Sequence, residues 1–274
     1  MITFPNCKIN LGLNILQKRE DGFHNLETVF YPLAFNDILE VVSCDTESRF
    51  INTGISGGEI ENNLCIKAYH LLKKDYPRLP EINMHLHKTI PVGAGLAGGS
   101  ADAAFTLTLL NEKFNLQIPL QQLFVYASQL GSDCPFFLIN SPCFATGVGE
   151  KLMKINLSMS AYKILLINPG IHISTKEVFN KIIPAIPKKR IDEIILQPIE
   201  SWKYDLKNDF EPIVFSMYPQ IKKLKESLYE QNAIYASMTG TGSSVYGIFR
   251  INDNIDFSHE KNHFYKWISL EQFL

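Results

Sequence analysis

The chain has 274 residues, of which 46% are hydrophobic and 20% are charged. This ordinary globular composition excludes a disordered chain, a collagen-like rod and a disulfide-stapled mini-protein, and the length predicts two packed units. The formal net charge of −2 at pH 7 argues against a non-specific nucleic-acid binder, because such a protein needs an excess of Lys and Arg to displace counterions.

In chain order, the first half shows alternation typical of strands and three- or four-residue spacing typical of helices. These patterns predict strands at 29–33, 38–42 and 81–90, and helices at 62–75, 101–114 and 120–130. The segments 136–139 and 143–146 bracket a turn at 140–142.

In the second half, residues 162–167 form a predicted buried strand, and residues 184–202 are predicted to be an irregular, mobile insertion. Helices are predicted at 175–183 and 219–231, and strands at 235–238 and 244–249. The best domain boundary lies near 151–161.

The five cysteines are scattered, and no CxxC pair occurs, which predicts small buried thiols in a reducing cytosol rather than zinc ligands. No run approaches the roughly 18 apolar residues that span a bilayer, and no signal-peptide pattern is present. The sequence therefore predicts a soluble, cytoplasmic protein. The cysteines are Cys7, Cys44, Cys65, Cys134 and Cys143.

A glycine-rich loop at 91–104 joins a predicted strand to a predicted helix, with four glycines inside residues 93–99. Glycines let backbone N–H groups approach a ligand, and a helix N-terminus favours an anion. Ser100 is a natural N-cap for the helix. The loop is therefore predicted to bind phosphate, the alternative being a tight turn without a ligand.

Two other phosphate motifs are excluded. A Walker A loop has Lys and then Ser or Thr after its last glycine, whereas Gly98 is followed by Gly99 and Ser100. Glycines 93, 95 and 98 spell GxGxxG, but a dinucleotide fold also needs an acidic residue about 20 positions later, after a second strand. The chain there reads NLQIP at 115–119. The HRD and DFG motifs of protein kinases are absent.

Three segments together resemble the GHMP kinase superfamily: 6–13 (NCKINLGL), the glycine loop, and 238–247 (MTGTGSSVYG). Three more are similar to the branch that phosphorylates a cytidine diphosphate conjugate: 18–26 (KREDGFHNL), 131–137 (GSDCPFF) and 208–212 (NDFEP). The departures are Cys7 for Ala, Phe23 for Tyr, and Ala97 and Ala101 for Gly and Ser. Ala101 removes one hydroxyl near the expected phosphates.

The resemblance implies an α+β protein with a two-domain GHMP kinase fold. It implies a ribosomal-protein-S5-like N-terminal domain at 1–155, a ferredoxin-like C-terminal domain at 156–274, and an active site in the cleft between them. It also implies that ATP with Mg²⁺ phosphorylates the 2-hydroxyl of the methylerythritol unit, in non-mevalonate isoprenoid synthesis. The expected protein is a monomer or homodimer that binds neither nucleic acid nor membrane.

The resemblance assigns catalysis to Asp133, as the base that takes the hydroxyl proton, and to Lys8, as the cation beside it. Asn10 lies on the same face of its strand as Lys8 and is expected to orient the substrate. Without the resemblance, Asp133 is more typical of a helix-capping or turn aspartate, and Lys8 is equally typical of a solvated lysine at a strand edge.

The remaining assignments also follow from the resemblance. His24 and Phe23 are expected to hold the cytosine, with Phe179 as the second aromatic, although core packing is the commoner fate of phenylalanine. The expected substrate site is completed by Thr175, Gly240, Thr241 and Gly242. The expected ATP site comprises Pro91, Val92, Gly93, Ala94, Gly95, Leu96, Ala97, Gly98, Gly99, Ser100 and Ala101, with Asn63 and Lys88. Ser100 is the candidate metal ligand.

Two further readings remain open. One is another small-molecule GHMP kinase, of the mevalonate or homoserine type, which has no use for the DGFH segment at 21–24. The other is a non-catalytic sensor on the same fold, which tolerates loss of Lys8 or Asp133, although both are present. His85 and His87 share a strand face, but with no third ligand at suitable spacing they are interpreted as ordinary strand residues.

Overall fold

The structure is a computed structural model that describes residues 1–55, 63–255 and 263–270. Its internal contacts define two packing units that interleave along the chain. Unit 1 contains residues 1–7, 35–92 and 97–141, and unit 2 contains residues 8–34, 93–96 and those from 142 onward. The contiguous domains 1–155 and 156–274 stay a prediction.

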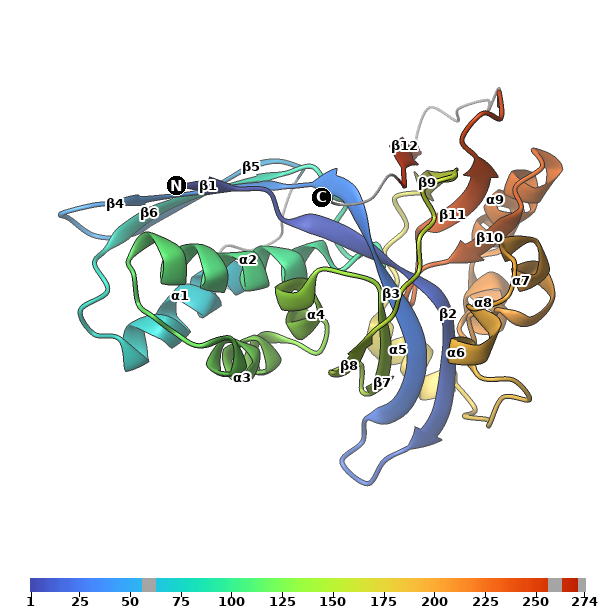
Figure 1. The fold of residues 1–274 in the computed structure, drawn as a ribbon, viewed down its shortest axis with the longest axis horizontal. Coiled ribbons are helices and arrows are strands. Elements are labelled where there is room, and N and C mark those ends of the chain that lie inside the picture. Colours follow the sequence, from blue (N-terminus) through green and yellow to red (C-terminus); the bar gives the residue numbers. More distant parts are fainter. Residues whose placement is uncertain (56–62, 256–262, 271–274) are drawn as a thin grey trace. The chain divides into compact units, whose positions relative to one another are not determined.

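Unit 1 is built on a four-stranded sheet in the order β1-β4-β6-β5, in which only the β5–β6 pair is parallel. Helices α1 and α2 cover one face of it (Figure 1). Alternate residues of β4 and β6 point to these helices, and Leu39, Val41 and Leu86 are buried there, because a strand presents every second side chain to one face. The elements are β1 (Ile2–Thr3), β4 (Ile38–Ser43), β5 (Arg49–Gly54), β6 (Ile82–Lys88), α1 (Leu64–Asp75), α2 (Gly98–Lys113), α3 (Leu120–Leu130) and α4 (Cys134–Ile139).

Unit 2 holds most of two further four-stranded sheets, in the orders β2-β3-β7-β8 and β10-β11-β9-β12. Helix α9 packs against β10 and β11, and its buried face contributes Ile221, Leu224 and Leu228 to the core. The strands are β2 (Asn6–Lys18), β3 (His24–Asn36), β7 (Cys143–Gly147), β8 (Lys151–Lys154), β9 (Tyr162–Asn168), β10 (Tyr235–Met238), β11 (Val245–Arg250) and β12 (Phe264–Ser269). The helices are α5 (Thr175–Lys181), α6 (Ile191–Ile194), α7 (Ile199–Asp205), α8 (Glu211–Met217) and α9 (Pro219–Glu230).

One expectation from the sequence is wrong and another is wrong in part. Helix α2 begins at Gly98 with Ala97 as its N-cap residue, so Ser100 lies inside the first turn and is not the cap. Residues 136–139, for which no element was predicted, belong to helix α4, and the predicted turn at 140–142 follows them. The segment 184–202 is irregular at 184–190, as predicted, but it also contains α6 and the start of α7, and Trp202 is fully buried.

Other expectations are confirmed with small shifts. Helix α3 has the predicted bounds. Helix α1 begins at Leu64, where the Asn63 side chain accepts a hydrogen bond from the Cys65 N–H over 2.8 Å; residue 62 of the predicted helix lies outside the described residues. Four of the five cysteines are buried and all are unbridged. None of the helices in the described part of the chain is both long and apolar enough to cross a membrane.

Candidate active site

The middle of the glycine loop, residues 93–96, packs within unit 2. A Cβ atom on Gly95 would lie 2.1 Å from the carbonyl oxygen of Thr239, and the residue has φ +76°. Only glycine fits such a position. The Thr239 hydroxyl donates to the Gly95 carbonyl over 3.0 Å, and the Ser244 N–H donates to the Ala94 carbonyl over 3.2 Å. The first glycine loop is therefore held by the second one, at 238–247.

The second glycine loop carries the predicted residues Gly240, Thr241 and Gly242. The Thr241 hydroxyl lies 3.2 Å from that of Thr175, at the start of α5. The structure therefore brings together two of the predicted substrate residues. Both hydroxyls are exposed, which leaves them accessible to a ligand.

The N-terminal part of β2 forms a buried polar cluster in unit 2. The Lys8 ammonium donates to Asn10 Oδ1 over 2.6 Å and lies 4.7 Å from the centre of the Phe30 ring. The Asn10 amide in turn donates to the Thr28 hydroxyl over 3.0 Å. Lys8 is only 3% exposed, so the alternative of a solvated strand-edge lysine is wrong.

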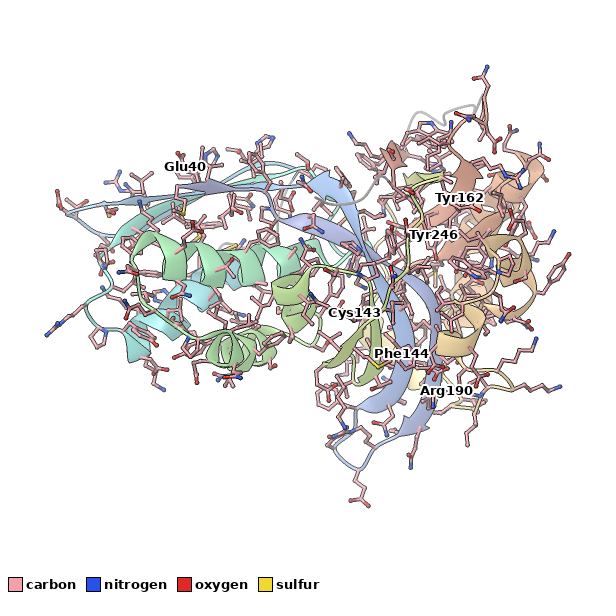
Figure 2. The ribbon with its side chains drawn as sticks, viewed as in Figure 1. Glu40, Cys143, Phe144, Tyr162, Arg190 and Tyr246 are labelled. Carbon is pink, nitrogen blue, oxygen red and sulfur yellow. The ribbon has the colours of Figure 1, made fainter. Side chains whose placement is uncertain are left out.

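The backbone of Asn10 is also fixed, because its carbonyl accepts a hydrogen bond from the Tyr246 hydroxyl over 2.7 Å. Tyr246 lies in β11 (Figure 2) and is completely buried. The Asn10 N–H donates to Thr239 Oγ1 over 3.1 Å. Lys8 and Asn10 therefore project from a rigid strand, which suits groups that orient a substrate.

Asp133 lies in unit 1, at the residue before helix α4, with φ −86° and ψ −15°. Its side chain makes no capping hydrogen bond to that helix, so the structure gives no support to the helix-capping alternative. The carboxylate is half-buried. The chain around it is constrained, because the Cys134 N–H donates to the Gly131 carbonyl over 3.2 Å and Pro135 follows.

His24, Phe23 and Phe179 are the three residues whose rings are predicted to bind the cytosine, and two of these rings are in contact. The centres of the His24 and Phe179 rings lie 5.3 Å apart, and Phe179 packs edge-on against the buried ring of Phe210 at 4.7 Å. Burial lowers the pKa of His24, and the nearby Lys18 lowers it further, so the imidazole is neutral at pH 7. Phe23 is 63% exposed, so core packing, the alternative for this ring, is wrong.

Two predicted nucleotide residues, Asn63 and Lys88, have structural partners. Asn63 caps α1. The Lys88 ammonium forms ion pairs with Asp37 and Asp102, and all three residues are buried in unit 1. Sequence reasoning missed both carboxylates, since Asp37 follows Asn36 in a turn-like pair and Asp102 follows a glycine run.

Among the described residues, no three His, Cys, Asp or Glu side chains gather as a metal site. His85 and His87 instead flank Thr53, whose hydroxyl lies 2.8 Å and 2.9 Å from their ring nitrogens. This agrees with their interpretation as strand residues.

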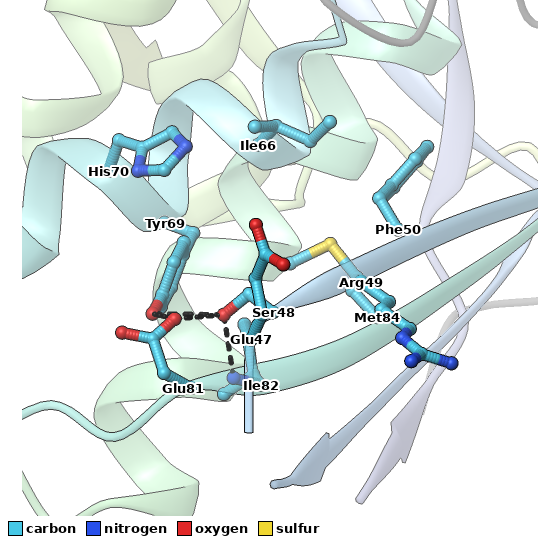
Figure 3. Close-up of a pocket in the computed structure, with 10 residues that line it drawn as sticks. All are labelled: Glu47, Ser48, Arg49, Phe50, Ile66, Tyr69, His70, Glu81, Ile82 and Met84. Carbon is cyan, nitrogen blue, oxygen red and sulfur yellow. Dashed lines mark hydrogen bonds between the residues drawn. The ribbon is translucent and has the colours of Figure 1, made fainter. Parts of the chain in front are cut away.

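A separate pocket of about 420 Å³ lies at the edge of unit 1, between α1 and the start of β5 and β6 (Figure 3). The Ser48 hydroxyl, Glu81 and Tyr69 form one hydrogen-bonded wall of it. Lys88 lies at the opposite end of β6, so this pocket is not the phosphate site.

Comparison with known proteins agrees with these features. Residues 63–141 match the GHMP kinases N terminal domain, and residues 182–260 match the GHMP kinases C terminal domain. A solved homoserine kinase from Cytophaga hutchinsonii shares the fold with a TM-score of 0.69 at 13% identity, covering 98% of this chain and 96% of its own. The fold and the glycine loops therefore define a GHMP kinase, an ATP-dependent kinase of small molecules.

Closer relatives narrow the class. A protein from Bacteroides thetaiotaomicron, "4-diphosphocytidyl-2-C-methyl-D-erythritol kinase", is 52% identical over 91% of this chain and 92% of its own length. A protein of the same name from Azobacteroides pseudotrichonymphae is 50% identical over 91% and 94%. The crystal structure of a 4-(cytidine 5'-diphospho)-2C-methyl-D-erythritol kinase matches with a TM-score of 0.77 at 30% identity, over 90% of this chain and 89% of its own. The chain belongs to the family of 4-diphosphocytidyl-2-C-methyl-D-erythritol kinases.

Proposed function

We propose that the protein transfers the γ-phosphoryl group of ATP to the 2-hydroxyl of 4-diphosphocytidyl-2-C-methyl-D-erythritol, in non-mevalonate isoprenoid synthesis. The observation that carries this choice of substrate is the contact between His24 and Phe179. Mevalonate and homoserine contain no nucleobase, so a kinase of either needs no second base site besides that for ATP, whereas a cytidine diphosphate conjugate needs an aromatic surface with hydrogen-bonding groups.

The base is held by stacking and by directed hydrogen bonds. A neutral imidazole offers one donor and one acceptor, and burial keeps His24 neutral. The exposed Phe23 ring provides apolar area for stacking. Thr175 and Thr241, whose hydroxyls lie 3.2 Å apart, bind the substrate together with Gly240 and Gly242.

The phosphates of ATP are bound by the loop from Pro91 to Ala101. Backbone N–H groups at the start of an α-helix are available to a bound phosphate, and the helix dipole favours its negative charge. A protein of net charge −2 can bind phosphate in this way, because backbone N–H groups and the helix dipole attract the anion without a surface rich in Lys and Arg.

Asp133 takes the proton of the attacking hydroxyl, and Lys8 stabilises the negative charge that develops on that oxygen. Asn10 orients the acceptor, since its side chain is fixed by Lys8 and Thr28. Phosphoryl transfer needs positioning and charge neutralisation more than covalent chemistry from the protein, and these three residues supply both.

The donor set fits Mg²⁺ that arrives with ATP rather than a resident metal. Ser100, in the first turn of α2, is the one protein hydroxyl that we assign to the ion, and Mg²⁺ is commonly held by phosphates and water with few protein ligands. When bound, the ion neutralises charge on the phosphates. The cytoplasmic location and the choice between monomer and homodimer remain predictions.

The test is a substrate comparison. Purified protein is incubated with ATP and Mg²⁺ and with 4-diphosphocytidyl-2-C-methyl-D-erythritol, mevalonate or homoserine in separate reactions. We expect phosphorylation of the cytidine conjugate only. Turnover of mevalonate or homoserine in its place would support another GHMP kinase, and ATP binding without turnover of any of the three would support the non-catalytic sensor.

A further inference from the structure

Resting on the proposed function, we propose that Lys88, Asp37 and Asp102 form a buried ionic support that positions the glycine loop for ATP. In this role Lys88 acts through the loop and does not touch the nucleotide. The three residues are positioning residues, and they come from β6, the β3–β4 turn and the first turns of α2.

Asp37 holds the chain that enters the loop. One of its oxygens accepts hydrogen bonds from the N–H groups of Thr89 and Ile90, over 2.6 Å and 2.9 Å. Its other oxygen pairs with the Lys88 ammonium. Asp37 therefore fixes the two residues that lead from β6 into Pro91.

Asp102 holds the chain that leaves the loop. Its Oδ2 lies 2.7 Å from the Lys88 ammonium nitrogen, and the residue lies in the first turns of α2. The same ammonium packs against the helix start, because a Cβ atom on Gly98 would lie 3.3 Å from Lys88 Nζ. Lys88 therefore ties both flanks of the loop to one point.

The charges explain why a lysine is kept in this interior position. Burial alone would lower the pKa of Lys88, but Asp102 and Asp37 together raise it, so the group stays a cation. Without that cation, two buried carboxylates would lie without an ionic partner, and an uncompensated buried charge destabilises a protein strongly. Their negative charge would also lie beside the helix N-terminus that we expect to bind phosphate. Lys88 is the ion-pair partner of Asp102 Oδ2, and Asp102 Oδ1 has no hydrogen-bond partner among the described residues. Removal of Lys88 would therefore leave the Asp102 carboxylate without its ionic partner.

Direct nucleotide binding by Lys88 fits the structure less well. The side chain is 4% exposed, and Asp37 and Asp102 are 0% and 2% exposed. To reach a ligand, the ammonium would have to leave two buried carboxylates. The two roles predict different effects on nucleotide binding. If the three residues support the loop, altering either Asp37 or Asp102 weakens nucleotide binding. If Lys88 contacts the nucleotide directly, only a change of Lys88 weakens it.

The experiment uses the full chain with Asp102→Asn, Lys88→Met and Lys88→Arg. Binding of ADP is measured by calorimetry without acceptor, and the KM values for ATP and for the cytidine conjugate are measured separately. Asp102→Asn keeps the shape of the side chain, so it serves even if Lys88→Met does not fold. The matched control is Leu110→Ala, a buried substitution in the same helix outside the ion cluster, with Tm recorded for each protein.

We expect Asp102→Asn to weaken ADP binding about tenfold and to raise the KM for ATP equally, while the KM for the conjugate stays within about twofold. Lys88→Arg should bind ADP more tightly than Lys88→Met, because it keeps the positive charge. Leu110→Ala should lower Tm without weakening ADP binding. Unchanged ADP affinity in Asp102→Asn overturns the proposal, whether or not Lys88→Met has lost binding. Because ADP binding needs no acceptor, this result stands apart from a failure of the proposed substrate.

Discussion

The side-chain amide of Asn208 donates a hydrogen bond to the carbonyl oxygen of Gly240 over 2.8 Å, and a second one to the carbonyl of Met238 over 2.9 Å. Its own oxygen accepts from the Phe210 N–H over 3.0 Å. Asn208 is buried. Its amide therefore supplies hydrogen bonds to carbonyl groups of the second glycine loop that water does not reach, and it holds that loop in place.

Asn208→Asp should therefore destabilise the protein. The substitution removes both N–H donors and places a carboxylate against two carbonyl oxygens, at a cost of about 2–4 kcal/mol in the free energy of unfolding. Urea denaturation measures the loss. The exposed Asn252→Asp is the matched control and should change stability by less than about 0.5 kcal/mol; equal effects of the two would refute the role of Asn208.

Ala97→Gly should stabilise the fold. Ala97 is the N-cap residue of α2 and has φ +54°, in the left-handed region, where a Cβ atom costs roughly 1–2 kcal/mol. We expect a gain of about 1 kcal/mol in urea denaturation. Ala101→Gly, within α2, should have the opposite sign, with a loss of about 1 kcal/mol. A loss of stability in Ala97→Gly would contradict the prediction, because it would mean that the Cβ atom of Ala97 causes no backbone strain at φ +54°.

Asp133→Asn should reduce kcat by about 10²- to 10⁴-fold while ADP binding is retained, because it removes the proton acceptor and keeps the side-chain shape. Steady-state kinetics and calorimetry measure the two quantities. The exposed neighbour Ser132→Ala should leave both near the wild-type values. Near-normal kcat in Asp133→Asn would remove Asp133 as the base.

His24 should make stability depend on pH. Its pKa in the folded protein is lowered by burial and by Lys18, so its contribution is present above its ordinary value of 6.5 and is lost as pH falls through the folded value. Between pH 7.5 and pH 5, wild type should lose more free energy of unfolding than His24→Gln. His70→Gln, at an exposed position, should follow wild type. Parallel curves for wild type and His24→Gln would contradict the prediction.

The sequence predicted those parts of the protein that depend on local pattern. Alternation in 81–90 identified β6, and a spacing of two residues placed Lys8 and Asn10 on one strand face, where they form a hydrogen bond. Four glycines in seven residues predicted a phosphate-binding loop, and the tight packing of that loop at Gly95 is observed. The resemblance to the family then suggested roles for residues such as Asp133, and these roles stay predictions.

Long-range partners were beyond that reasoning. Lys88 and Asp37 are 51 residues apart, and nothing in either local segment specifies the other. The edge strands β5, β8 and β12 were missed because they are short, of four to six residues, and carry weak alternation. Ser100 was misassigned as a cap because the left-handed Ala97 begins the helix earlier than a capping side chain would indicate.

The dependence of Gly95 on Thr239 bears on how the protein is made. The carbonyl of Gly95 and the N–H of Asn10 both bond to Thr239 Oγ1, across 144 and 229 residues of chain. A ribosome adds roughly 5–20 residues each second, so synthesis of the 144 residues between Gly95 and Thr239 takes about 7 to 30 seconds. A nascent or truncated chain that ends before β10 lacks these anchors for the loop. A chain that stops before Thr239 therefore carries the complete segment 93–96 without the side chain that holds Gly95.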